Sequence, residues 1–191
     1  MRLKLSIAVL FAASASVGST LRAGVISGPI VDPANHHSYY LLDADSWTAS
    51  EAEAKTLGGD LATIRNAAEN AWVFDTFSGG QRNLWIGLND GGFTGTFSWA
   101  DNEPFVYSNW DVANGQPNLG PERWVFIVKG NLGNGELAEH WHDIIDNPTP
   151  SYFWVGPVYG VVEVVPEPSA LILAALGGLA LFAFRRQACR A

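Results

Sequence analysis

The chain contains only one cysteine in 191 residues, Cys189, which lies close to the C-terminal end. A disulfide needs two cysteines and thiolate metal sites use several, so the rest of the chain can have neither. Its stability must come from packing. A domain of about 140 residues buries roughly two-thirds of its unfolded surface, which is enough for one core without crosslinks.

Basic residues are also scarce over most of the chain. Gly24 to Pro166 contain 5 basic and 18 acidic residues, a net charge of about −13, whereas the whole chain carries −8. Such a surface repels phosphate backbones, so we expect no nucleic-acid partner. An acidic surface of this kind favours solubility, cation binding or binding to a basic partner.

Motifs for catalysis are missing as well. No Ser/His/Asp or Cys/His set stands out, and no glycine-rich phosphate loop follows a strand. His140 and His142 could place two imidazoles on one strand face, as in some zinc sites, but no helix-borne His-Glu motif supplies a general base. His36 and His37 belong to the first predicted strand, over 36–42, and we do not expect them to complete such a site. We therefore predict a protein that is not an enzyme.

The first 23 residues have the pattern of a secretory signal. Arg2 and Lys4 precede an apolar stretch from Leu5 to Val17 that is rich in small residues. The stretch lacks the amphipathic stripe of a buried helix. We expect residues 1–23 to be a signal peptide and residues 24–35 to be a polar lead-in to the main domain.

The C-terminal end combines a motif, a short apolar run and basic residues. The segment from Val165 through Pro166 and Glu167 to Pro168 precedes a predicted membrane helix over 169–184 and a basic end over 185–191. An apolar helix over Ala170 to Phe184 would reach about 22–24 Å, short of the roughly 30 Å hydrocarbon core. By the positive-inside rule, the basic residues at both ends place the intervening domain outside the cytoplasm.

This tail resembles the PEP-CTERM sorting tail of Gram-negative bacteria over about 26 residues. The matching positions are Val165, Pro166, Glu167, Pro168, Arg185 and Arg186. The resemblance implies cleavage near the motif by an exosortase, transient anchoring in the inner membrane, and a producer of extracellular polysaccharide. It places the protein at the cell envelope, the outer surface or the extracellular matrix. A plain membrane anchor is the alternative.

Two helices followed by short strands and long loops indicate an α+β fold. Ser46 and Asn66 are positioned as N-caps, and paired glycines follow each expected helix. We predict helices over 47–57 and 67–77, a short strand or extended link over 61–64, and strands over 36–42, 84–88, 97–99, 124–128 and 159–165.

The order of motifs from His36 to Val164 resembles the C-type lectin-like domain. The most diagnostic piece is Trp85-Ile86-Gly87-Leu88; the others are 57–62, Glu69-Asn70, 97–99, Asn109-Trp110, 115–118, Trp141-His142-Asp143 and 161–163. The resemblance implies two helices, small antiparallel sheets and a long loop region over 36–164. Most of the eight tryptophans are expected in the core, with Trp110 and Trp154 as the candidates for exposure.

The chain departs from this family at its disulfides. The usual bridge between the first helix and the last strand falls on Ala54 and Val162, which predicts an apolar contact instead. The second bridge falls near Trp124 and Asp146, so packing around Trp124 must compensate for a bridge typically worth about 2–5 kcal/mol.

The resemblance also implies a Ca²⁺ and sugar site. The candidate ligands are Gln116, Asn118, Glu122, His142 and Asp143, with Pro117 as a cis-proline that aims the flanking carbonyls. Ca²⁺ takes six to eight hard oxygens, and an imidazole at His142 suits transition metals better.

Two functions are left open. One is a surface or matrix module that binds a glycan or extracellular polysaccharide, with Ca²⁺ as a candidate cofactor. The alternative is a Ca²⁺-independent protein-binding or structural matrix domain on the same fold, because function lies in the loops.

Overall fold

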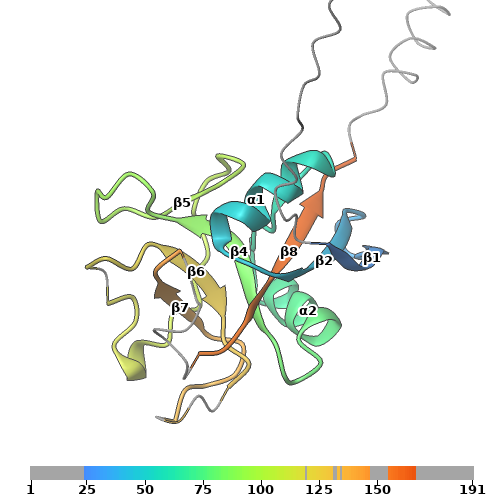
Figure 1. Ribbon diagram of the computed structural model, residues 1–191. Coiled ribbons are helices and arrows are strands. Elements are labelled where there is room, and N and C mark those ends of the chain that lie inside the picture. The colour runs from blue at the N-terminus through green and yellow to red at the C-terminus, as the bar shows by residue number, and fades with distance from the viewer. Residues whose placement is uncertain (1–23, 119, 131–132, 134, 147–154, 167–191) are drawn as a thin grey trace, which may run out of the picture.

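The computed structural model describes residues 24–118, 120–130, 133, 135–146 and 155–166. The two helices lie in one half of the domain with β1, β2 and β8, and the other half contains β5, β6, β7 and the long loops between them (Figure 1). The elements in chain order are β1 (Val25–Val31), β2 (Ser38–Ala44), α1 (Trp47–Thr56), β3 (Asp60–Leu61), α2 (Ala67–Phe77), β4 (Asn83–Asn89), β5 (Ser98–Trp99), the 3-10 helix η1 (Val112–Asn114), β6 (Trp124–Ile127), β7 (Trp141–Ile144) and β8 (Val158–Val164).

The strands form a single eight-stranded sheet rather than the several small sheets that the sequence predicts. Its order is β1-β2-β8-β4-β6-β7, with β3 paired to β8 and β5 paired to β4. All pairings are antiparallel except β4 with β8. The parallel pair brings the last strand into the centre of the sheet, where it joins the early and late parts of the chain.

The expected lead-in contains a strand. Val25 to Val31 form β1, which pairs with β2 at the edge of the sheet. Val25, Ile26 and Val31 remain exposed. The Gly and Pro content of this segment predicted a lead-in without a strand. Its pairing with β2 is irregular, with register shifts on both sides of Ser27.

Both helices begin where their capping residues predict. The Ser46 side chain accepts a hydrogen bond from the N–H of Ala49, and the Asn66 side chain accepts one from the N–H of Glu69. These bonds satisfy donors that a helix leaves free in its first turn. Helix α1 packs against β3, β4 and β8.

Glycine is required within the diagnostic strand. A Cβ atom on Gly87 would lie 2.4 Å from the carbonyl oxygen of Leu61. The N–H of Gly87 donates to the carbonyl oxygen of Ala62 at 2.9 Å, so the link after β3 crosses directly over β4. This close approach explains why the strand reads Trp-Ile-Gly-Leu.

Tryptophans fill the core of the loop-rich half, as predicted. Trp85 and Trp141 are completely buried, and Trp99 packs edge-on against Trp141 at 5.9 Å between ring centroids. Trp110 is half-buried and contacts Phe97 and Trp141, so it is not the exposed platform that the sequence suggests. Trp154 lies outside the described residues.

Apolar packing occurs at Ala54, Val162 and Trp124, three of the positions that correspond to the family's usual disulfides. Ala54 and Val162 lie in one fully buried cluster with Leu42, which confirms the predicted contact. Trp124 is half-buried and packs against a second cluster that contains Trp85 and Phe126.

No described helix is long and apolar enough to cross a bilayer. The predicted signal helix over 1–23 and the predicted membrane helix over 169–184 lie outside the described residues, as do Glu167, Pro168, Arg185 and Arg186. Val165 and Pro166 are exposed, directly after β8 ends at Val164.

Candidate functional site

The candidate binding loop follows η1 and ends shortly before β6. The peptide bond between Gln116 and Pro117 is cis, the isomer expected there. The N–H of Asn118 donates to Oδ1 of Asp143 at 3.0 Å, and the N–H of Asp143 lies 3.4 Å from Oε1 of Gln116. These two contacts hold the loop on the side of β7.

The structure therefore brings three of the candidate residues together. Asp143 is buried and acts as the anchor, Gln116 is half-buried, and Asn118 is exposed. Glu122 is half-buried on the segment that leads into β6. The result is a polar, amide-rich loop supported from below by one carboxylate.

His142 does not join this group. Its ring is buried, and Nε2 lies 3.2 Å from Oδ2 of Asp111. The ring also lies 5.8 Å from that of Phe126. Adjacent residues of a strand point to opposite faces, which separates the imidazole of His142 from the carboxylate of Asp143.

Asp111 is the residue that sequence reasoning missed. It is completely buried and accepts hydrogen bonds from Asn114 at 2.8 Å and from the N–H of Leu137 at 3.3 Å. Burial alone would raise the pKa of Asp111, but the bonds from Asn114 and His142 hold this pKa below its usual value. The only feature of the sequence that points to Asp111 is its position directly after Trp110.

These residues do not fit a Ca²⁺ ion of the kind that bridges a protein to a sugar. His142 offers nitrogen and is already paired, and Oε1 of Gln116 faces the N–H of Asp143. The set then supplies at most two carboxylates for an ion that takes six to eight oxygens. Across the described ranges, no group of three His, Cys, Asp or Glu residues is arranged to hold a metal.

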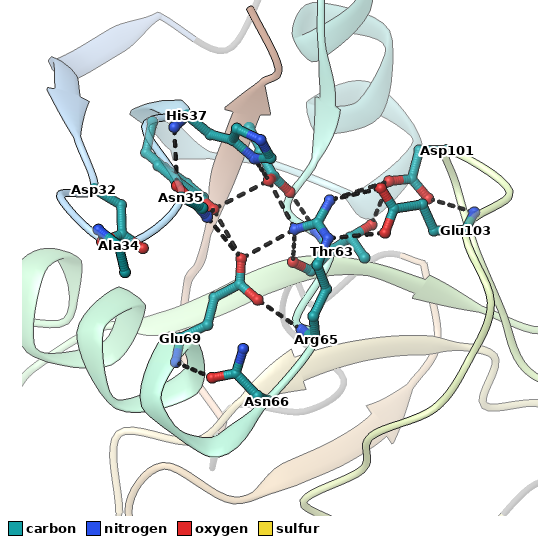
Figure 2. Close-up of polar contacts among 12 residues, drawn as sticks. Asp32, Ala34, Asn35, His37, Thr63, Arg65, Asn66, Glu69, Asp101 and Glu103 are labelled. Atoms are coloured by element: carbon teal, nitrogen blue, oxygen red, sulfur yellow. Dashed lines mark hydrogen bonds and ion pairs between the residues drawn. The ribbon is translucent and has the colours of Figure 1, made fainter.

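A second polar cluster lies between β2, β8 and the start of α2 (Figure 2). Nη1 of Arg65 lies 3.0 Å from Oε1 of Glu69 and 2.8 Å from Oε1 of Glu163, and both carboxylates are buried. Its Nε donates to Glu103 at 2.8 Å. Nδ1 of His37 lies 2.5 Å from Glu163. We refer to Arg65, Glu69, Glu103, Glu163 and His37 as the Arg65 network.

In the Arg65 network, the positive charge of the arginine is compensated by the surrounding carboxylates. Burial disfavours the guanidinium, but hydrogen bonds with Glu103 and Glu163 raise the pKa of Arg65 above its usual range. Burial, together with the charges of Glu163 and Glu69, raises the pKa of Tyr39, whose hydroxyl donates to both carboxylates. This arrangement ties together residues about a hundred positions apart in the sequence.

The remaining histidines form no zinc site with His142. His37 belongs to the Arg65 network, and Nδ1 of His140 lies 3.0 Å from the carbonyl oxygen of Ala138. Within the described part of the chain, these imidazoles therefore have separate partners.

Two family models match the chain. The Lectin C-type domain matches residues 43–125, and the PEP-CTERM protein-sorting motif matches residues 164–187. The motif implies export and sorting to the cell surface.

Curated relatives include a receptor and a lectin. The human C-type mannose receptor 2 is 31% identical over 90 residues, which is 47% of this chain but only 6% of that receptor. Lectin BRA-3 of Megabalanus rosa is 28% identical over 116 residues, covering 60% of this chain and 67% of the lectin.

Solved structures share the fold. The cow C-type carbohydrate-recognition domain of CD23, crystallised in the presence of a GlcNAc2Man3 oligosaccharide, has a TM-score of 0.54 and 25% identity, covering 68% of this chain and 88% of that one. A calcium-independent type II antifreeze protein has a TM-score of 0.53 at 20% identity, covering 70% and 93%. The latter likeness shows the fold alone.

Proposed function

Because the chain carries a C-type lectin domain followed by a PEP-CTERM sorting motif, we propose that it is an exported, surface-sorted module that binds carbohydrate. The observation that carries the proposal is the anchoring of the loop containing Gln116 and Asn118 onto the buried carboxylate of Asp143. A loop fixed in this way can present its amides to sugar hydroxyls with little loss of entropy on binding. The ligand is a glycan or extracellular polysaccharide.

Binding of this kind would not depend on Ca²⁺. The resemblance implies a Ca²⁺ bridge, but the pairing of His142 with Asp111 removes one ligand and leaves too few carboxylates. Binding would instead rest on direct hydrogen bonds from the loop.

Processing is the second part of the proposal. An exosortase would cut near Val165 to Pro168, after transient anchoring of the C-terminal helix in the inner membrane. Since Val165 and Pro166 are exposed just beyond β8, an enzyme could reach the start of the motif without unfolding the sheet. The mature module would then lie on the cell surface or in the matrix. It would act by binding rather than by catalysis.

A glycan array probed with the full chain, once with Ca²⁺ and once with EDTA, tests this function. We expect the same glycans to bind under both conditions, because the loop needs no ion. Gln116→Ala and Asn118→Ala should each weaken binding about tenfold, the effect of losing one well-placed hydrogen bond. Gln81→Ala, which removes an exposed amide from the loop after α2, is the matched control and should leave binding unchanged.

Melting curves with Ca²⁺ and EDTA complete the test, because a ligand that binds only the folded state raises its stability. A clear Ca²⁺-dependent rise in the melting temperature would overturn the Ca²⁺-independent form of the proposal. Failure to bind any glycan would overturn carbohydrate recognition itself.

The second candidate is a Ca²⁺-independent protein-binding or structural matrix domain. The observation that favours it is the buried contact between His142 and Asp111. This contact engages a candidate Ca²⁺ ligand, His142, in a structural pair. Capture of a defined matrix protein by the full chain, unaffected by Gln116→Ala and without glycan binding, would select this candidate.

A further inference from the structure

A cavity of about 350 Å³ lies between the loop that joins β1 to β2 and the first turns of α2. None of the described residues of the loop over 116–122 lines it. Figure 2 shows Asp32, Ala34 and Asn35 on one side, and Asn66 and Glu69 on the other. The lining residues are Asp32, Pro33, Ala34, Asn35, Arg65, Asn66, Ala68, Glu69 and Trp72.

The wall of the cavity is largely apolar, with Trp72 as its largest side chain. Trp72 is half-buried: its ring lies 5.0 Å from Tyr39 and 6.0 Å from Phe77 between centroids. The indole N–H groups of Trp47, Trp85 and Trp141 bind protein oxygens, whereas that of Trp72 has no acceptor among the described residues. Trp72 therefore offers an aromatic surface and a free donor to a ligand.

Asp32 supplies a buried acid in the same cavity. Its side chain lines the space although the residue is only 3% exposed. Oδ1 accepts a hydrogen bond from the N–H of Ala34 at 2.8 Å, while Oδ2 receives none from the described residues. A carboxylate oxygen that lines a cavity and has no donor from the described residues can form a charge-assisted hydrogen bond with a ligand that brings a cation.

The charges around the cavity also favour a cationic ligand. Arg65 is the only cationic side chain of the lining, and its guanidinium is shared among Glu69, Glu103 and Glu163. Two lining residues, Asp32 and Glu69, are acidic. The cavity consequently carries net negative charge and would attract a positively charged group.

We propose that this cavity binds one protonated amino-sugar residue of a polysaccharide, at a site separate from the Gln116 loop. The volume is at the small end of ligand cavities, which suits a single pyranose ring. The ammonium group would pair with Asp32, and the ring would lie against Trp72, whose indole also attracts cations. This inference rests on the proposed function, because it names the carbohydrate class and adds a second contact for the same polymer.

Calorimetric titration of the full chain with a glucosamine oligosaccharide tests the site, with an N-acetylglucosamine oligosaccharide of equal length as the neutral probe. We expect the neutral probe to bind at least about tenfold more weakly, because it lacks the charge-assisted bond. Asp32→Asn keeps an acceptor for the N–H of Ala34 and should weaken glucosamine binding by a similar factor.

Ala68→Arg fills the cavity from an exposed position of α2 and should abolish glucosamine binding. Ala67→Arg is the matched control, since it adds the same charge at the next exposed position, which does not line the cavity. It should keep the affinity of the wild type. Equal losses in the two variants would mean general electrostatic attraction to an acidic domain and would overturn the inference.

The outcomes separate this site from the loop. If Asn118→Ala abolishes glucosamine binding and Ala68→Arg does not, the cavity is rejected and the proposed function stands. Absence of glucosamine binding while neutral glycans bind would likewise reject the cavity and leave the proposed function standing. If no carbohydrate of any kind binds, both proposals fail.

Discussion

Nε2 of His142 lies 3.2 Å from Oδ2 of Asp111, a carboxylate that is completely shielded from solvent. This contact joins the inner face of β7 to the residue that precedes η1. It fixes the base of the binding loop, because the carbonyl oxygen of Asp111 also accepts a hydrogen bond from the N–H of Gln116 at 3.1 Å. The pair thus has a structural role at the place where the resemblance implies a metal ligand.

Removing the imidazole should destabilise the domain. We expect His142→Leu to lower the free energy of unfolding by about 2–3 kcal/mol, since Asp111 would lose one of its buried donors. Urea denaturation at pH 7 measures this change. His140→Leu, two residues away and half-buried, is the control and should shift stability by less than about 0.5 kcal/mol. Equal stability of the two variants would show that the pair contributes little.

The Arg65 network should be the most sensitive polar feature. Arg65→Met leaves the buried carboxylates of Glu69 and Glu163 without their main cation, and breaking a buried pair from one side costs about 3–5 kcal/mol. Denaturant unfolding of Arg65→Met and of Arg82→Met at pH 7 measures the difference.

Arg82 is the matched control because its guanidinium lies 5.4 Å from the ring centre of Tyr159 and contacts no buried carboxylate among the described residues. Its replacement should cost at most about 1 kcal/mol. A comparable loss for both arginines would argue against a special role for the Arg65 network.

Glu51 should make stability fall as pH rises through the weakly acidic range. Burial raises the pKa of Glu51 from 4.5 to about 7, against the opposing hydrogen bond from the N–H of Leu61. Below pH 4.5 both states hold the proton. Between pH 4.5 and 7 only the unfolded state releases it, so stability is lost in this window.

The expected loss between those limits is about 2–3 kcal/mol. Glu51→Gln keeps an acceptor for Leu61 and should flatten this part of the pH profile of unfolding. Glu53→Gln, on the same helix, should retain the slope of the wild type. A Glu51→Gln profile that falls as steeply as the wild type would refute the assignment.

The shared cluster of Ala54 and Val162 should accept a crosslink. In a Cys189→Ser background, Ala54→Cys with Val162→Cys should form a disulfide under oxidising conditions and raise stability by about 2–4 kcal/mol, since the bridge would close a long loop. Thiol titration and melting with and without reductant provide the measurement. Each single variant serves as a control, and a doubly substituted chain that keeps two free thiols would contradict the contact geometry.

Much of the architecture could be predicted from the sequence because it follows from local signals. Ser46 and Asn66 set the helix starts through bonds within one turn, and the apolar run around Trp85 forms the central strand. The family resemblance, which places the usual bridge on Ala54 and Val162, likewise predicted their apolar contact. Strand β1 was not predicted, because its pairing with β2, and not its composition, identifies it as a strand.

The sequence by itself determined an acidic, cysteine-poor domain with its helices and central strand, and it predicted export and a lectin-type fold. Only the tertiary structure decided which polar side chains meet. The pairing of His142 with Asp111 and of Arg65 with Glu163 spans 31 and 98 residues of chain. Such contacts depend on strand order and on which face of a strand a side chain occupies, and no local spacing specifies them. For that reason the Gln116 loop was found from its motif, whereas the cavity beside Trp72 emerged only from the fold.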